Sequence, residues 1–262
     1  MGTSTGTVDV IDLERRVREV YRAVAERPEE QYHFEMGAGL AARLGYPKDM
    51  LDLIPAESLA SFAGVGWFFD LLGDLHGRHV LDLGSGSGTD SFAALRLVGQ
   101  AGSVTGVDMT AAQREKAERL ATAGGMENVH FLDGHIEDPP VASGVFDAVI
   151  SNGVINLSAD KPAVFRQAAR ALRPGGRRAL ADIVSERPLT EAIACNAELW
   201  ASCIGGASQI DDYLGAIESA GLRVDTVRDN PAYAFLSDSA QGATATFGIK
   251  SISLLATKPV TS

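Results

Sequence analysis

The stretch HVLDLGSGSGTD, residues 79–90, places three glycines directly after a short apolar run. Gly84, Gly86 and Gly88 permit positive φ angles and a close approach of the backbone to a ligand. A turn of this kind at the end of a parallel strand is typical of nucleotide-binding sites. Thr89 stands three residues after Gly86, where a dinucleotide-binding motif has its third glycine. The pattern therefore favours a nucleoside ligand other than a dinucleotide.

An acidic side chain precedes this turn. Asp82 lies inside the end of the apolar run, where its carboxylate would repel a pyrophosphate group. The same carboxylate would attract an ammonium group, either directly or through a water molecule. The sequence therefore favours a nucleoside that carries an amino acid.

Apolar runs alternate with helical segments from residue 79 onward. Strands that alternate with helices of about a dozen residues indicate a parallel sheet covered on both faces. Thr110 and Asp160 are the expected N-cap residues of two of these helices. Strands are expected in residues 79–84, 103–109, 129–134, 146–157, 223–230 and 248–259. Residues 173–184 are expected to form a turn, at 173–176, followed by a strand. Helices are expected in residues 90–99, 110–125, 160–172, 189–204 and 209–222.

The N-terminal part of the chain shows no clear periodicity of apolar residues as a whole. Residues 9–28 are the exception, because their apolar side chains recur at helical spacing. We expect residues 1–70 to form a helical cap and acceptor-site segment over a core of residues 71–262. Inserted helices are expected in that core near residues 189–215.

Composition limits the classes of function. The 262 residues carry a formal net charge of −11, which argues against a nucleic-acid partner because such proteins need a basic surface. Two cysteines are too few for a disulfide framework or a four-cysteine zinc site, and no metal site is predicted. No secretory signal and no apolar run of membrane-spanning length is found. We therefore expect a cytoplasmic enzyme without a membrane partner.

Polar and soft side chains follow the other predicted strands. Asp108 ends the second strand, 24 residues after Gly84, where a carboxylate accepts hydrogen bonds from both ribose hydroxyls. Met109 offers an apolar face for a purine. The third strand is followed by DGHIED, residues 133–138, where an acidic side chain would accept a hydrogen bond from an adenine amino group. The fourth strand is followed by SNGVINL, residues 151–157.

Over about residues 60–185 the sequence resembles a class I S-adenosylmethionine-dependent methyltransferase. The resemblance rests on five segments in this order: LDLGSGSG, GVDM, GHIED, SNGVINL and LRPGG. The resemblance implies a Rossmann-like α/β fold: a mostly parallel seven-stranded sheet, helices on both faces and an N-terminal helical cap. It implies an enzyme that transfers a methyl group from S-adenosylmethionine to a small molecule. The cofactor residues are then Asp82, with Gly84, Ser85 and Gly86 at the methionine end, Asp108 at the ribose, Met109, Ile136 and Glu137 at the adenine, and Asn152 and Val154 on the sulfonium side.

A narrower resemblance concerns the acceptor. Four segments are similar to bacterial arsenite methyltransferases: SFAGVG, GVDMT, SNGVINLSADKP and LWASCIGGA. In that family, cysteine thiolates bind trivalent arsenic. By that similarity Cys203 matches an arsenic-binding cysteine, whereas Cys195 has no assigned match. The chain also departs from the family: no cysteine precedes position 195, a later C-terminal cysteine is absent, and Gly153 stands where many members have cysteine. Both cysteines are alternatively small buried apolar residues.

The main hypothesis is an organic acceptor bound under the cap, and arsenite bound through Cys203 is the alternative. Segments 31–41 and 62–72 would supply the organic acceptor's pocket. His33 is the candidate general base, and Tyr32 is a weaker candidate.

Two further alternatives stay open. Trp67, Phe68 and Phe69 form either an aromatic wall for the acceptor or part of the core. The protein either transfers methyl groups or binds the cofactor while catalysing a non-methylating reaction. It is expected to be a monomer or a homodimer.

Overall fold

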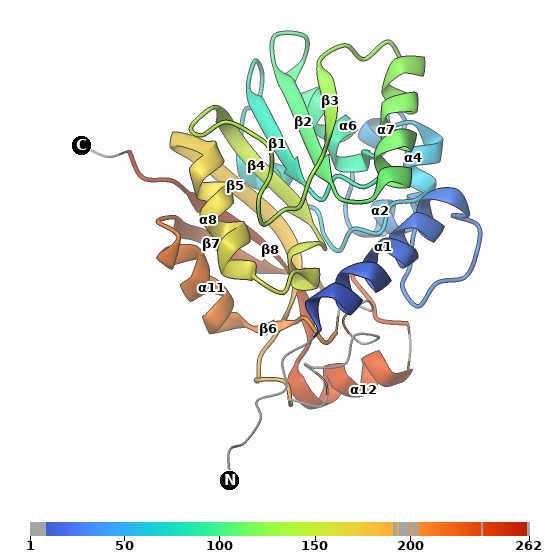
Figure 1. Cartoon of the computed structure of the whole chain (residues 1–262), viewed down its shortest axis with the longest axis vertical. Coiled ribbons are helices and arrows are strands. Elements are labelled where there is room, and N and C mark those ends of the chain that lie inside the picture. Colours follow the sequence, from blue (N-terminus) through green and yellow to red (C-terminus); the bar gives the residue numbers. More distant parts are fainter. Residues whose placement is uncertain (1–8, 191–192, 194–199, 201–203, 237, 261–262) are drawn as a thin grey trace.

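The computed structural model describes residues 9–190, 193, 200, 204–236 and 238–260. Its sheet contains β1 (His79–Leu83), β2 (Ser103–Asp108), β3 (Val129–Asp133), β4 (Phe146–Asn152), β5 (Leu172–Ser185), β6 (Ser208–Gln209), β7 (Arg223–Asp229) and β8 (Lys250–Thr257). The strand order is β3-β2-β1-β4-β5-β8-β7, and the two-residue β6 pairs with β5 (Figure 1). Strands β1 to β5 run parallel, whereas β8 is antiparallel to both β5 and β7. The expected mostly parallel sheet is confirmed.

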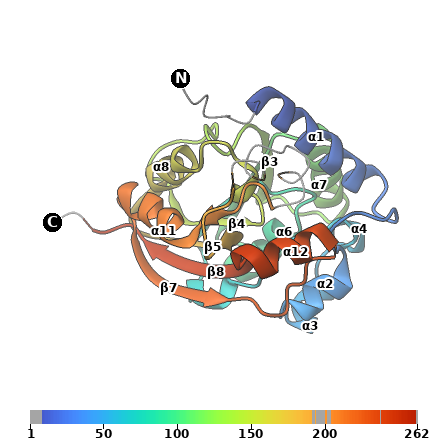
Figure 2. The ribbon, with the colours of Figure 1, turned by 90° about the horizontal axis from the view of Figure 1, so that it is seen from below.

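Helices cover both faces of this sheet, because alternate residues of each strand point to opposite sides. In β4, Ala148 and Ile150 pack in the cluster that contains α6 (Thr89–Val98) and α7 (Ala111–Ala123). Val149 packs in the other cluster, with α8 (Lys161–Ala171) and α11 (Ile210–Ser219). The view from below shows α8 and α11 side by side (Figure 2). Both faces of the central strands are therefore buried, as an α/β fold requires.

Two of the expected helix starts can be compared with the structure. Asp160 caps α8, since its carboxylate accepts a hydrogen bond from the backbone N–H of Ala163 at 2.9 Å, and Pro162 stands in the first turn. Thr110 occupies the N-cap position of α7, but its side chain forms no capping hydrogen bond. The start of α8 agrees with the prediction in full, and that of α7 agrees in position only.

Strand β5 begins at Leu172 and so includes residues 173–176, where the sequence predicts a turn. Its pairing with β4 is interrupted, since Phe146 pairs with Leu172 but Ala148 pairs with Arg177. The four residues 173–176 therefore lie opposite the single residue Asp147, and Gly175 supplies a left-handed φ of +78° there. The expected turn is a bulge in the strand.

The N-terminal segment contains α1 (Val10–Glu26), α2 (Ala38–Arg43), α3 (Lys48–Leu51), α4 (Ala56–Ala60) and α5 (Phe69–Leu72). Asp9 is the N-cap residue of α1, and its carboxylate accepts hydrogen bonds from the N–H groups of Ile11 and Asp12 at 3.0 and 3.2 Å. Helix α1 buries Leu13 and Val17 and contacts α7. The helix expected in residues 9–28 is confirmed.

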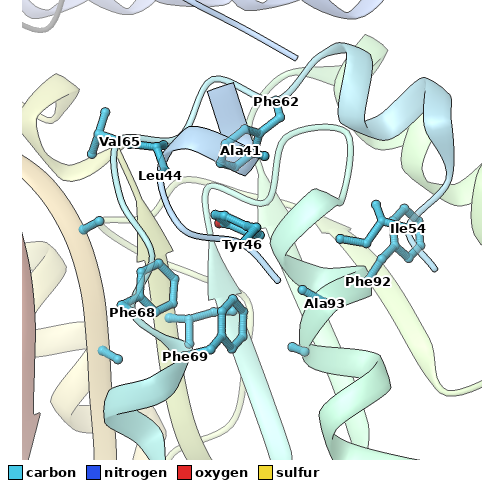
Figure 3. Packing of buried hydrophobic residues seen from close by; sticks show 14 of the residues in the cluster. Ala41, Leu44, Tyr46, Ile54, Phe62, Val65, Phe68, Phe69, Phe92 and Ala93 are labelled. Atoms are coloured by element: carbon cyan, nitrogen blue, oxygen red, sulfur yellow. The ribbon is translucent and has the colours of Figure 1, made fainter. Parts of the chain in front are cut away.

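The aromatic residues that precede β1 pack into the core (Figure 3). The rings of Phe68 and Phe69 are buried and stack with centroids 4.9 Å apart. Trp67 packs edge-on against Tyr46 at 4.7 Å. Of the two alternatives for these aromatic residues, the structure supports packing.

The C-terminal part contains a helix that the sequence did not predict, α12 (Asp238–Phe247). Most of the helical segment expected near residues 189–204 lies outside the described residues. Among the described helices, none is long and apolar enough to cross a membrane.

Candidate functional site

One large cavity opens at the carboxyl ends of β1, β2 and β4, where ligands bind in open α/β sheets. Its volume is about 710 Å³, within the range typical of small-molecule sites. Every residue that the sequence assigned to cofactor binding lines it: Asp82, Gly84, Ser85, Gly86, Asp108, Met109, Ile136, Glu137, Asn152 and Val154.

The glycine turn after β1 leaves no room for a side chain at Gly84. Gly84 has a φ of +78°, and a Cβ atom added there would lie 2.5 Å from methyl carbons of Val154. The hydroxyl of Ser85 is buried and has no hydrogen-bond partner in the part of the chain that the structure describes. Buried polar groups are normally paired, so this hydroxyl fits a ligand that would hydrogen-bond to it.

Asp108 ends β2 beside the turn. Its two carboxylate oxygens accept hydrogen bonds from the backbone N–H groups of Gly86 at 2.9 Å and Thr110 at 2.8 Å. Burial raises the pKa of Asp108, although these two hydrogen bonds act in the opposite direction. Each oxygen retains a lone pair, so the carboxylate can accept two further hydrogen bonds from a ligand.

Two more buried carboxyl groups line the cavity. Asp82 accepts a hydrogen bond from the hydroxyl of Ser91 at 2.7 Å. Asp90, in the first turn of α6, accepts one from the hydroxyl of Tyr46 and one from the amide of Asn152, the latter at 3.0 Å. Asp90 was missed from the sequence because an acidic residue in a first helical turn is ordinary.

Asn152 links β4 to the N-terminal segment. Its side-chain oxygen accepts a hydrogen bond from the N–H of Val65 at 2.7 Å. Its amide nitrogen donates to the carbonyl of Gly66, the hydroxyl of Tyr46 and a carboxylate oxygen of Asp90, each at 3.0 Å. Asn152 therefore positions residues from three separate parts of the chain at the cavity.

The opposite side of the cavity follows β3. The side chain of Ile136 is buried, and Met109 is half-buried against the core. The hydroxyl of Ser158 donates a hydrogen bond to the carboxylate of Glu137. These residues give an apolar surface with one carboxylate beside it, which can pack against a flat heteroaromatic ring.

Helix α1 forms a further wall, with Val10, Leu13, Glu14, Val17 and Tyr21. Glu14 and Arg18 both contact His135 of the loop after β3, at 3.2 and 3.1 Å. The periodicity of α1 predicted an amphipathic helix, but periodicity does not identify what the apolar face covers. The role of α1 in the cavity was therefore missed.

Two of the three candidate catalytic residues, Tyr32 and His33, lie away from the cavity. The hydroxyl of Tyr32 donates to the carbonyl of Arg27 at 3.1 Å, and His33 packs edge-on against Phe34. Neither residue lines the cavity, and burial raises the pKa of Tyr32. Cys195 and Cys203 lie outside the described residues.

The acceptor segments also differ from expectation. None of residues 31–41 lines the cavity, and of segment 62–72 only Phe62, Ala63 and Gly64 do so. Within the described ranges, no group of three His, Cys, Asp or Glu residues is arranged to hold a metal ion.

Comparisons with known proteins agree with this geometry. A family model described as a methyltransferase domain matches residues 75–221. The arsenite methyltransferase of Aquipseudomonas alcaligenes is 42% identical over 63% of this chain and 49% of its own length. That of Halobacterium salinarum is 37% identical over 78% of this chain and 52% of its own. The chain thus spans about half the length of these curated relatives.

A solved structure is similar as well. It is an arsenic(III) S-adenosylmethionine methyltransferase from Chlamydomonas reinhardtii, with a TM-score of 0.64 and 30% identity, covering 86% of this chain and 74% of that one. The family model alone covers more than half of the chain. The chain therefore belongs to the methyltransferase domain family, and its resemblance to class I S-adenosylmethionine-dependent methyltransferases is confirmed.

Proposed function

We propose that this chain transfers a methyl group from S-adenosylmethionine to a small organic acceptor. The observation that carries the proposal is the convergence of the predicted strand-end residues in one cavity. When bound, the cofactor supplies a methyl group already activated by a sulfonium. The protein must hold the acceptor at near-attack distance and exclude water.

The residues present fit this cofactor. The turn at Gly84 and the unpartnered hydroxyl of Ser85 would hold the amino-acid part. Asp108 has lone pairs left for ribose hydroxyls, and Met109 and Ile136 would flank the adenine. Asn152 would border the sulfonium side, and its own hydrogen bonds hold that wall in place.

The organic acceptor is favoured by the rest of the cavity wall. Leu13 and Val17 from α1, Phe62, and Leu157 beyond β4 present apolar surface, to which an apolar or aromatic molecule binds by desolvation. This wall would also exclude water from the transfer. The acceptor would then lie against α1 rather than against segment 31–41.

Arsenite is the second candidate, favoured by the similarity to arsenite methyltransferases. Cys203 would be the arsenic-binding thiol. Position 153 weighs against it, since Gly153 has a φ of +70° and a side chain there would begin 3.1 Å from a methyl carbon of Val65. The expected family cysteine at this position is thus replaced by a glycine whose backbone disfavours any side chain.

The experiment is transfer of isotope-labelled methyl from S-adenosylmethionine to a panel of organic acceptors and to arsenite with glutathione. Methylated organic product supports the main proposal. Methylated arsenic that disappears in Cys203→Ser supports the second. Tight cofactor binding without formation of S-adenosylhomocysteine from any acceptor would instead support a non-methylating reaction.

The variant Asp108→Ala checks the cofactor site itself. We expect it to weaken cofactor binding by about 1–3 kcal/mol in calorimetric titration, because a charge-assisted hydrogen-bond acceptor is lost. Unchanged affinity would contradict the ribose assignment.

A further inference from the structure

Among the described residues, the wall of the large cavity contains many acidic side chains and no Lys or Arg. All 23 Lys and Arg residues of the chain lie within the described ranges, and none of them lines the cavity. His135 is the one basic side chain among the described lining residues. Eight carboxyl side chains line the cavity: Glu14, Asp82, Asp90, Asp108, Asp133, Glu137, Asp138 and Asp160.

Cations outside the cavity balance only part of this charge. Three of the carboxylates form ion pairs with arginines that do not line the cavity: Glu14 with Arg18 at 2.8 Å, Asp133 with Arg114 at 2.8 Å, and Asp160 with Arg166 at 3.9 Å. The other five of the eight form no ion pair with a Lys or Arg in the part of the chain that the structure describes. The ammonium of Lys161 attracts Glu137, but it donates to the carbonyl of Ser158 at 2.9 Å and does not line the cavity. The cavity therefore keeps an excess of negative charge, and the ammonium, carboxylate and sulfonium of the cofactor would together balance only part of it.

Resting on the proposed function, we propose that the cavity selects its acceptor by charge: it binds amines, accepts uncharged molecules less well, and rejects carboxylates and phosphates. An anionic group that entered the cavity would lose its water without gaining a Lys or Arg partner from the described wall. An ammonium group would be attracted by the excess of carboxylates. The apolar side chains of Leu13 and Val17 would hold the rest of the molecule.

Methyl transfer to an amine is compatible with this electrostatic field. The bound ammonium first loses a proton to solvent, so that its nitrogen has a free electron pair. The nitrogen then attacks the methyl carbon, an N–C bond forms, the S–C bond breaks, and the electron pair of that bond stays on sulfur. The positive charge moves from sulfur to nitrogen and stays close to the same carboxylates, which stabilise it before and after the transfer.

The sign of the potential can be measured with charged thiol reagents at a cysteine placed in the wall. Ala63 is half-buried and lines the cavity, whereas Ala101 is exposed and does not line it. Ala63→Cys and the control Ala101→Cys are each made in the full chain that also carries Cys195→Ser and Cys203→Ser. Each variant reacts with a trimethylammonium, a sulfonate and an uncharged methanethiosulfonate, and the uncharged reagent corrects for access.

At low salt we expect the ratio of the cationic to the anionic reaction rate to be at least about 10-fold higher at position 63 than at position 101. The difference should shrink at high salt, because salt screens the carboxylates. Equal ratios at the two positions, or faster reaction of the sulfonate at position 63, would overturn the inference.

A second measurement compares three probes of similar shape. Phenylethylamine, phenylethanol and phenylacetate are a cation, an uncharged molecule and an anion near neutral pH, and each is titrated into the full chain saturated with S-adenosylhomocysteine. We expect the affinity to fall in that order, by about threefold or more at each step. Glu14→Gln should reduce the preference for the amine over the carboxylate by about threefold. The matched control is Glu19→Gln on the same helix, whose side chain is 62% exposed and outside the cavity, and it should leave this preference unchanged.

Failure of this inference can be distinguished from failure of the proposed function. If S-adenosylhomocysteine does not bind, the proposed cofactor site is wrong, while the reagent rates still report the potential of the cavity. If it binds but phenylacetate binds as tightly as phenylethylamine, the selection by charge is wrong and the cofactor site stands. Equal loss of the amine preference in Glu14→Gln and Glu19→Gln would assign the effect to the overall charge of the chain, which also contradicts the inference.

Discussion

Acidic side chains are buried at both ends of the sheet, but their hydrogen-bond and ion-pair partners differ. At the amino end, Asp147 of β4 accepts a hydrogen bond from the backbone N–H of His79 at 2.8 Å and forms ion pairs with Arg173 and Arg78. At the carboxyl end, Asp82 and Asp90 receive hydrogen bonds from neutral groups. One end thus supplies its own cations, and the other does not among the residues that the structure describes.

This difference predicts a structural role for Asp147 and a ligand-binding role for the carboxylates at the other end. A buried charge is tolerated when it is paired within the fold, as Asp147 is. A buried acid without a partner reduces stability unless it is protonated or a ligand supplies the cation. We therefore expect changes at the amino end to alter stability, and changes at the carboxyl end to alter ligand binding.

The largest expected effect comes from two glycines on either side of β1. Gly84 and Gly77 have φ angles of +78° and +71°, but an added Cβ would meet Val154 at 2.5 Å in the first case and Ala101 at 3.8 Å in the second. Alanine at either position should lower the free energy of unfolding by about 1–2 kcal/mol through backbone strain. Only Gly84→Ala should also weaken S-adenosylhomocysteine binding, on the order of 100-fold or more, because the turn must move. Equal affinities of the two variants would contradict the comparison.

The next effect is on the pH dependence of stability. The pKa of Asp90 is about 6 when folded, against an ordinary value of 3.8, so the folded state binds more protons between these values. The contribution of Asp90 to the free energy of unfolding is therefore largest below about pH 4. This contribution is lost as the pH rises through 6. The loss is on the order of 2–3 kcal/mol.

Asp90→Asn removes this titration. Relative to the wild type, we expect the variant to gain stability between pH 4 and pH 7 in urea denaturation of the ligand-free protein. A constant difference between wild type and variant across this range would show that folding does not raise the pKa of Asp90.

The sequence predicted which residues at the ends of β1, β2 and β4 meet in the cavity. It did not predict which residues of other elements join them there. The positions of Gly84, Asp108 and Asn152 followed from the rule that parallel strands bring their carboxyl ends together. Asp90 could not be identified, because its significance depends on contacts with Tyr46 and Asn152, which are distant in the sequence. Such contacts leave no local pattern.

The catalytic candidates were chosen by chemical type alone. His33 and Tyr32 can act as acid or base, but no periodicity or motif constrained where they lie, and the structure places them away from the cavity. Helix α1 illustrates the converse: its apolar face was predicted, yet the surface that it covers depends on the tertiary fold. Cys203 lies outside the described residues, so its role stays a prediction.

The smallest expected effect is at the amino end. Asp147→Asn keeps the size of the side chain but leaves Arg173 and Arg78 without their carboxylate. Because both arginine side chains are nearly half exposed, at 46% and 47%, water compensates part of the loss. We expect a decrease of about 1–2 kcal/mol in the free energy of unfolding.

The matched control is Asp74→Asn, which lines the same small cavity near Asp147. Asp74 accepts a hydrogen bond from the backbone of His76, and its replacement should change stability by less than about 0.5 kcal/mol. Neither variant should change the affinity for S-adenosylhomocysteine, since the ion pairs of Asp147 are complete without a ligand. An altered affinity in Asp147→Asn, with Asp74→Asn unchanged, would mean that the two ends of the sheet are coupled through β4.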